Sequence, residues 1–315
     1  MDSRILDHFA TKTVLVLGDV MLDKYVWGRV TRISPEAPVP IVEIERESYA
    51  PGGAGNLASN IASLGGKVVL IGVVGDDAHK DVLARELAQR GIFGKLLVDN
   101  RPTITKMRIM GHKQQLMRVD YEQTHYIDAP TQERVLDLVR KTPADAIVVS
   151  DYAKGLITQA LYSEVLRIAE ERQIPLLVDV KPKHKVNYAG ATVIKTNHKE
   201  ACELAGVDEH NGDGMEGIGR NLIAQLQSHV VVTRGEKGVS IFSRDGTTAH
   251  VPTRAKQVFD VTGAGDTFLA GLTLAFICGE SLESSAHIAN HAAGIKVGKV
   301  GTASVSAEEL RKELG

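Results

Sequence analysis

The chain has almost no excess of charge of either sign. Its 37 lysines and arginines nearly balance its 39 aspartates and glutamates, so that the formal net charge is −2 over 315 residues. Nucleic-acid binders concentrate positive charge on one face or in one run, and no long run of one sign occurs here. The composition therefore argues against DNA or RNA as the principal partner.

Cysteine is scarce, with only Cys202 and Cys278 in the whole chain. The two lie far apart in apolar, helix-like stretches, and neither belongs to a Cys-x-x-Cys pair. This spacing favours reduced thiols over a disulfide or a zinc site. The histidines form no spacing typical of metal ligands either, so we expect no metal cage of Cys and His residues.

Long hydrophobic runs are also missing. No apolar stretch reaches the roughly 18 residues that span a bilayer, and the first residues lack the basic start and apolar core of a signal peptide. We therefore expect no membrane partner and a cytoplasmic location. Hydrophobic residues still make up 43% of the chain, which is enough for a large core.

What the sequence does contain is a regular alternation of helical and strand patterns. Helices are predicted over 54–64, 131–141, 158–171, 213–226, 264–278 and 282–298, strands over 13–17, 68–73, 146–150, 175–179, 192–195 and 229–233, and a hairpin over 238–251. Such alternation favours an α/β fold with a mostly parallel, helix-covered sheet. No repeat, low-complexity tract or linker divides the chain, so we predict a single domain over residues 1–315.

Four alternating segments depart from this pattern. They cover residues 25–29, 39–45, 103–110 and 115–119, and Gly111-His112-Lys113 joins the last two. They predict a small accessory sheet that acts as a lid, with segments of about 24–48 and 103–120. Its apolar residues need cover, which predicts a homodimer formed through the lid. These residues are Val39, Ile41, Ile109 and Met117.

The most informative motif runs from Asp260 to Asp266, with the sequence Asp-Val-Thr-Gly-Ala-Gly-Asp, and an apolar run follows it. Its two glycines let the backbone N–H groups of residues 263–266 converge on one anion at a helix start. An acid there fits if it accepts a proton from a hydroxyl that attacks a phosphate. The motif therefore favours phosphoryl transfer to an alcohol, with Asp266 as the base. A plain helix cap formed by Asp266 is the alternative.

Polar residues also gather at the ends of predicted strands, where open α/β sheets bind their ligands. They are Asp19 and Asp23, Asp151 and Lys154, Asp179 and Lys181, Asn197 and Glu200, and Thr233-Arg234-Gly235. For any one acid, a cap or a turn is the simpler interpretation. Their accumulation on one edge of the sheet is what favours a site.

A second glycine-rich stretch, Pro51 to Asn56, precedes a predicted helix. Its amides can approach a ligand closely while Asn56 faces hydroxyl groups, or it is a turn and a cap. It lacks the Gly-x-Gly-x-x-Gly spacing of dinucleotide sites, and no Gly-Lys-Ser/Thr follows a glycine-rich loop anywhere. A nucleotide, if bound, is therefore not held by a Walker A loop.

Two charged stretches suggest phosphate chemistry. Asn197 and Glu200 share one face of a helix start, where they are candidates to hold hydrated Mg²⁺, although the pattern is also close to a capping box. The basic stretch from Lys181 to Lys185 follows a strand. We assign an anion-binding role to Lys181 and a solvated one to Lys183 and Lys185.

In this order, these features resemble the ribokinase-like (PfkB) carbohydrate kinases, from Gly18-Asp19 to the helix around Asn290. Three stretches, residues 18–25, 32–40 and 150–155, are similar to the heptose 7-phosphate kinases of that family. The resemblance implies a three-layer ribokinase-like fold with a small β-sheet lid. It also implies ATP-dependent phosphorylation of D-glycero-β-D-manno-heptose 7-phosphate at O1, in ADP-heptose and lipopolysaccharide core biosynthesis. Another sugar, sugar-phosphate or nucleoside kinase of the family, or a non-catalytic nucleotide sensor, is the alternative.

The resemblance implies roles for single residues as well. Asp266 matches the family's catalytic base, and Gly263, Ala264 and Gly265 match its anion hole. On the nucleotide side, the matches are Asn197 and Glu200 for a magnesium-associated pair, Thr233 and Gly235 for a nucleotide-phosphate contact, and Asn290 for the segment beside adenine. The positions that hold sugar hydroxyls are matched by Asp19, Asp23, Gly53 and Asn56. We add Asp151 to the substrate set, and Lys106, Arg118 and Lys181 as cationic donors for the sugar 7-phosphate. The implied cofactors are ATP and Mg²⁺, with K⁺ as a further candidate.

One position departs from ribokinase itself, because Ala54 stands where that enzyme has lysine, which fits the heptose group better than a ribose kinase. Heptose kinases are fused to an adenylyltransferase in many bacteria, but this chain contains no His-x-Gly-His segment of a nucleotidyltransferase. We therefore expect a stand-alone kinase or the kinase half of a fusion, with a sugar phosphate as small-molecule partner and a separate adenylyltransferase in the pathway.

Overall fold

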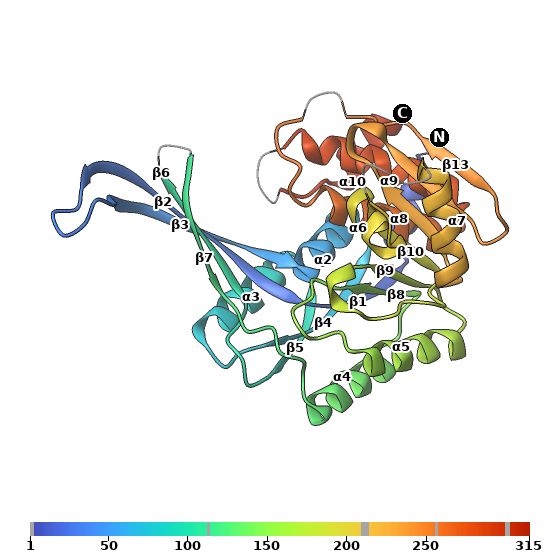
Figure 1. Ribbon diagram of the computed structural model, residues 1–315, viewed down its shortest axis with the longest axis horizontal. Helices are drawn as coiled ribbons and strands as arrows, with labels where there is room; N and C mark the ends of the chain where they lie inside the picture. The colour runs from blue at the N-terminus through green and yellow to red at the C-terminus, as the bar shows by residue number, and fades with distance from the viewer. Residues whose placement is uncertain (1–2, 112–113, 209–213, 256–257, 300–302) are drawn as a thin grey trace.

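The computed structural model describes residues 3–111, 114–208, 214–255, 258–299 and 303–315, which form a helix-covered central sheet and a smaller second sheet (Figure 1). The central sheet has nine strands in the order β13-β12-β11-β10-β9-β8-β1-β4-β5. The strands are β1 Thr13–Gly18, β4 Lys67–Val74, β5 Phe93–Val98, β8 Ala146–Ser150, β9 Leu176–Asp179, β10 Val193–Asn197, β11 His229–Thr233, β12 Val239–Phe242 and β13 Thr248–Val251. All pair in parallel except β12 and β13, which form an antiparallel hairpin at one edge.

Helices cover both faces of this sheet because its strands are apolar on both sides. Alternate side chains of β1 divide between two cores: Val14 and Val16 pack in one, and Leu15 and Leu17 in the other. The first core contains side chains of α1 Ile5–Phe9, α2 Ala54–Ser63, α3 Ala78–Gln89, α8 Ala264–Ile277, α9 Leu282–Val297 and α10 Ala307–Leu314. The second contains those of α4 Ala129–Lys141, α5 Gln159–Glu171, α6 His198–Ala205 and α7 Gly214–Leu226. The predicted three-layer α/β fold is confirmed.

The second sheet is the predicted lid, and Figure 1 shows it reaching away from the body of the molecule. Its strand order is β3-β2-β6-β7, with bounds β2 Val20–Ile33, β3 Pro40–Gly53, β6 Thr105–Gly111 and β7 Gln114–Tyr121. Strands β2 and β3 are longer than predicted, because they keep pairing down to Val20 and Gly53 beside the central sheet. The lid therefore begins directly after the carboxyl end of β1 in the central sheet. The turn residues His112 and Lys113 lie outside the described residues.

Several elements are absent from the sequence prediction. They are α1, α3, β5, α10 and the short 3-10 helices η1 Pro182–His184 and η2 Gly235–Lys237. Helix α3 buries only Leu83 and Leu87 on an otherwise polar helix, so its apolar pattern is weak. Helix α7 begins at Gly214, and residue 213, where its prediction began, lies outside the described residues. No described helix is long and apolar enough to cross a bilayer.

Candidate active site

Helix α8 starts where the central sheet, the lid and the glycine motif meet, and its first turn carries Asp266. The carboxylate is 6% exposed and accepts hydrogen bonds from Asn56 Nδ2 (2.5 Å) and Tyr152 Oη (2.9 Å). These donors come from two other elements, so the side chain is not serving as a cap for its own helix. Burial, followed by the charge of Asp179, raises the pKa of Asp266. A raised pKa suits a group that accepts a proton during a reaction.

The two motif glycines are required by their surroundings. Gly263 has φ 76°, and a Cβ atom on it would lie 2.9 Å from Asn56 Nδ2. A Cβ on Gly265 would lie 2.9 Å from the Nζ atom of Lys195. The backbone at the start of α8 is therefore in close contact with an amide and an ammonium group, at a helix end that attracts anions.

Two residues at this centre are not among the sequence predictions. Lys195, in the middle of β10, is 5% exposed, and its Nζ atom lies 3.1 Å from Asp179 Oδ1. Tyr152 binds Asp266 as described above. The signal for Lys195 is present in the sequence, because a lysine inside an apolar strand needs a partner. Tyr152 lies in a loop, where pattern alone carries no such signal.

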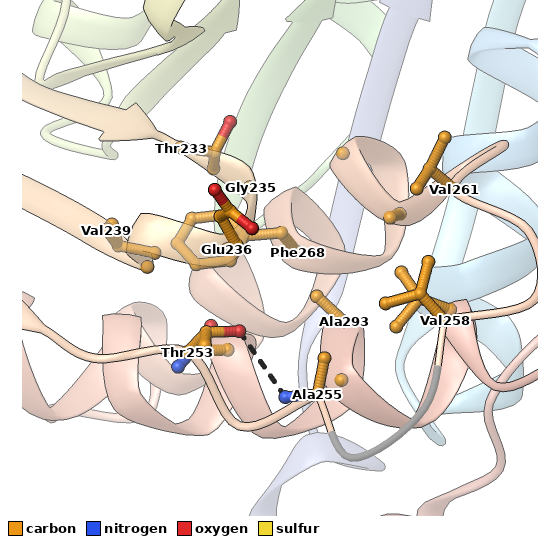
Figure 2. Close-up of a pocket in the computed structure, with 16 residues that line it drawn as sticks. Thr233, Gly235, Glu236, Val239, Thr253, Ala255, Val258, Val261, Phe268 and Ala293 are labelled. Atoms are coloured by element: carbon orange, nitrogen blue, oxygen red, sulfur yellow. Dashed lines mark hydrogen bonds between the residues drawn. The ribbon is translucent and has the colours of Figure 1, made fainter.

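A cavity of about 560 Å³ opens on one side of the start of α8 (Figure 2). Thr233, Gly235 and Asn290, which the sequence assigned to a nucleotide, line it together with Ala264 and Gly265. Figure 2 shows Thr233, Gly235 and Val239 along one side and Val258 and Val261 along the other. The structure thus brings three separately predicted residues into one largely apolar cavity. Its size suits a small organic ligand.

The predicted magnesium pair forms a capping box. Asn197 Oδ1 accepts the N–H of Glu200 (2.9 Å), and Glu200 Oε2 accepts that of Asn197 (3.0 Å). Glu200 also pairs with the Nζ atom of Lys181. Burial acts to raise the pKa of Glu200, but the bond and charge of Lys181 outweigh it and the pKa is lowered. Among the described residues no group of three or more His, Cys, Asp or Glu side chains is arranged to hold a metal.

The buried acids Asp19 and Asp151 bind groups of the protein itself. Asp19 accepts N–H bonds from Tyr152 (2.9 Å), Lys154 (3.0 Å) and Leu156 (3.2 Å), and Asp151 accepts from Tyr188 Oη (2.5 Å) and Ala153 N (2.7 Å). Burial and the charge of Asp151 raise the pKa of Asp19 to about 6. Both acids therefore hold the 152–156 loop, which carries the Tyr152 hydroxyl to Asp266.

Gly53, another predicted substrate residue, lies at the start of α2 with φ 56°. A Cβ atom there would lie 2.4 Å from the carbonyl oxygen of Asp19. The backbone at Gly53, at the base of the lid, is therefore closely packed against the end of β1. Three residues later, α2 presents Asn56 to Asp266.

A second cavity, of about 520 Å³, lies between the lid and residues 260–262. Tyr25, Arg90 and Arg108 line it together with Asp260 and Thr262. Arg108 Nη1 pairs with Oδ1 of the predicted substrate residue Asp23 at 2.5 Å, and its guanidinium lies 5.2 Å from the centre of the Tyr25 ring. Arg90 pairs with Glu86 at 2.7 Å. This second cavity, the lid cavity, is therefore lined by paired arginines and aromatic rings, in contrast to the first.

Two of the cationic residues predicted for a sugar phosphate, Lys106 and Arg118, are paired and are not among the residues that line this cavity. Lys106 bonds Asp120 (3.1 Å) and Glu122 (3.3 Å), and Arg118, half exposed, bonds Asp120 (2.9 Å). Arg108 lies two residues beyond Lys106 on the same strand. Alternate residues of a strand share a face, so the sequence pattern that indicated Lys106 also indicates Arg108. Arg90 follows α3, which the sequence prediction lacks.

Comparison with known proteins identifies relatives over nearly the whole chain. A family model described as pfkB family carbohydrate kinase matches residues 11–310. Proteins named "Bifunctional protein HldE" are similar: that of Geobacter metallireducens is 41% identical over 98% of this chain, and that of Azorhizobium caulinodans is 44% identical over 96%. The chain spans 64% of the length of each of these two relatives.

Solved structures share the fold at lower identity. Arabidopsis thaliana ribokinase complexed with ribose and ATP has a TM-score of 0.73 at 21% identity, covering 96% of this chain and 98% of that one. Escherichia coli phosphofructokinase-2 in complex with potassium has a TM-score of 0.81 at 18% identity, covering 96% and 97%. At these identities the likeness establishes the ribokinase-like fold alone.

Proposed function

Because the chain belongs to the pfkB family of carbohydrate kinases, we propose that it transfers the γ-phosphate of ATP to O1 of D-glycero-β-D-manno-heptose 7-phosphate. One observation carries the proposal: the motif 260–266 lines both cavities. Val261, Ala264 and Gly265 line the apolar cavity, whereas Asp260 and Thr262 line the lid cavity. A phosphate donor and its acceptor on opposite sides of one anion-binding turn are what phosphoryl transfer needs.

Asp266 is the base in this proposal. Its carboxylate takes the proton of the acceptor hydroxyl as that oxygen attacks the γ-phosphate, and the amides of residues 263–266 bind the charge on the transferred group. Asn56 and Tyr152 hold the carboxylate in place. The raised pKa of Asp266 makes it a stronger base than an exposed aspartate.

The nucleotide lies in the apolar cavity, with Thr233 and Gly235 toward its phosphates and Asn290 beside its base. Glu200 and Asn197 are the residues that would hold Mg²⁺ through water, and the ion would supply neutralisation of phosphate charge. The ammonium groups of Lys181 and buried Lys195 also lie near this site, and each is paired with a carboxylate, Glu200 and Asp179 respectively.

The heptose phosphate lies in the lid cavity. Arg108 and Arg90 are the donors that we propose for its 7-phosphate, because both line that cavity and arginine binds phosphate through two parallel N–H bonds. Lys106, Arg118 and Lys181 remain further candidates, and Asp19, Asp23, Gly53, Asn56 and Asp151 remain the candidates for the hydroxyl side. Closure of the lid keeps water away from the phosphate being transferred.

The lid also carries apolar side chains that a partner would cover. Ile33, Val39, Ile44 and Met117 are between 51% and 63% exposed. We propose a homodimer through this sheet, in the cytoplasm, whose product passes to an adenylyltransferase. A monomeric mass by light scattering at micromolar concentration would contradict the dimer.

The function is tested by ADP release from Mg-ATP with a panel of acceptors. The panel contains both anomers of heptose 7-phosphate, fructose 6-phosphate, ribose and adenosine, with Asp266→Asn as the inactive control. We expect turnover with a heptose 7-phosphate alone. Turnover of another acceptor would assign the chain to a sister kinase, and nucleotide binding without any turnover would identify a sensor.

A further inference from the structure

One buried charge has no part in the mechanism above. Lys296, in the last turn of α9, is fully buried and is among the largest side chains in the molecule with no solvent exposure. Burying an ammonium group is costly, and such groups are retained with partners. A lysine at this position therefore needs an explanation beyond packing.

Lys296 lies directly beneath the anion-binding turn. Its Cε atom is 3.6 Å from the position that a Cβ atom on Gly263 would occupy. The next residue along α9, Val297, accepts backbone N–H bonds from Phe259 (2.8 Å) and Asp260 (3.2 Å) through its carbonyl oxygen. The segment that leads into the motif is thus docked on the same end of α9 that carries the ammonium.

The charges around Lys296 are opposed. Burial lowers the pKa of Lys296, the carboxylate of Asp260 acts to raise it, nearby Lys299 lowers it, and Asp266 raises it. The two acids that favour the ammonium are the first and last residues of the motif. Its charge therefore acts on both ends of the turn that would hold the transferred phosphate.

We propose that Lys296 is a positioning residue whose ammonium is a built-in cation beneath residues 260–263, fixing the turn so that its amides meet the γ-phosphate. The inference rests on the proposed function, because it assigns the transferred phosphate to this turn. It also means that the protein supplies its own cation here, so that K⁺ is not needed to order the turn.

Two substitutions separate charge from packing. Lys296→Met fills the same space without charge, and Lys296→Ala leaves room for an ion. We expect Lys296→Met to lower kcat by about 10- to 100-fold through misplacement of the turn. The KM for the sugar phosphate should change little. Lys299→Met is the matched control, because Lys299 pairs with Glu309 at 2.6 Å.

Monovalent ions give a second readout. The wild-type rate should be equal in NaCl, KCl and choline chloride at the same ionic strength. Lys296→Ala should be slow in sodium or choline and regain rate in potassium or ammonium, whose ions can occupy the space left. A wild-type enzyme that requires K⁺ would overturn the proposal. If Lys296→Met fails to fold, this wild-type comparison decides alone.

A binding measurement separates this inference from the proposed function. By calorimetry, Lys296→Met should bind a non-hydrolysable ATP analogue more weakly than the wild type does and bind ADP equally well, whichever acceptor the enzyme uses. Wild-type kcat and unchanged analogue affinity in Lys296→Met would overturn the role of Lys296 while leaving the kinase assignment intact.

Discussion

The two cavities beside residues 260–266 are lined by different kinds of groups. The apolar cavity, which we assign to the nucleotide, is lined by apolar side chains and by glycine backbone, as at Gly235 and Gly265. The lid cavity is walled by arginines and aromatic rings, and its Arg108 is paired with Asp23. The first cavity would therefore recognise its ligand by shape and main-chain contacts, and the second by charged side chains.

Because of this difference, the two cavities contribute differently to the choice of substrate. Backbone amides and apolar walls bind a phosphate chain and a flat base whatever the acceptor is. Side chains on a lid select the acceptor, because their charge and spacing must match one substrate. We infer that the acceptor is determined by the lid and the chemistry by the motif.

The largest effect is expected at Asp266, in the motif that lies between the two cavities. Asp266→Asn removes the base but keeps the shape and the contact with Asn56, so kcat should fall by about 10²–10⁴-fold while both KM values stay close to wild type. Steady-state ADP release measures this. Activity equal to wild type would show that Asp266 is not the base.

The backbone character of the nucleotide side is tested next, with Gly263→Ala. The new Cβ atom would lie 2.9 Å from Asn56 Nδ2 at a residue with φ 76°, so the turn must move, and kcat should fall by about 10- to 100-fold. Gly279→Ala is the control, because its φ is also positive (98°) but nothing lies within 4 Å. It should lose about 1 kcal/mol of stability and no catalytic rate. Equal rate losses in both variants would attribute the effect to backbone strain alone.

The side-chain character of the lid is tested with Arg108→Met. The KM for the sugar phosphate should rise by about 10- to 30-fold, the value of a charge-assisted hydrogen bond, and the KM for ATP should not change. Arg118→Met provides the comparison, since Arg118 lies opposite Arg108 on the neighbouring strand but is not among the residues that line the lid cavity. A larger KM effect for Arg118→Met than for Arg108→Met would move the phosphate to the outer part of the lid.

The smallest expected effect concerns the stability contributed by Asp19, which lies between the end of β1 and the start of the lid strand β2. Asp19 has a native pKa of about 6, above its value in the unfolded chain, so the native state holds a proton that the unfolded state has lost. Its contribution to stability is therefore complete below about pH 4 and is lost as pH rises through about 6. Urea unfolding of the wild type should show this fall, with a slope of at most about 1.4 kcal/mol per pH unit, and Asp19→Asn should not. The same slope in both proteins would assign the pH dependence to another group.

The sequence predicted the two regions unequally, for physical reasons. The central strands are apolar on both faces and the motif glycines have few uses, so the fold and residues 263–266 could be predicted. Arg90 could not, because it follows a weakly amphipathic helix. Arg108 shares a strand face with the predicted Lys106, but its place beside the cavity depends on the register of β2 with β6. The buried lysines Lys195 and Lys296 stand in apolar runs, which is a signal present in the sequence.

The most direct test of the division between lid and motif compares two acceptors that differ only in the ester phosphate. The ratio of kcat/KM for heptose 7-phosphate to that for the unphosphorylated heptose should be measured in the wild type and in Arg108→Met. We predict a strong preference for the phosphate ester in the wild type, which collapses in Arg108→Met with the KM for ATP unchanged. A preference of the same size in both proteins would contradict the assignment of acceptor recognition to the lid cavity.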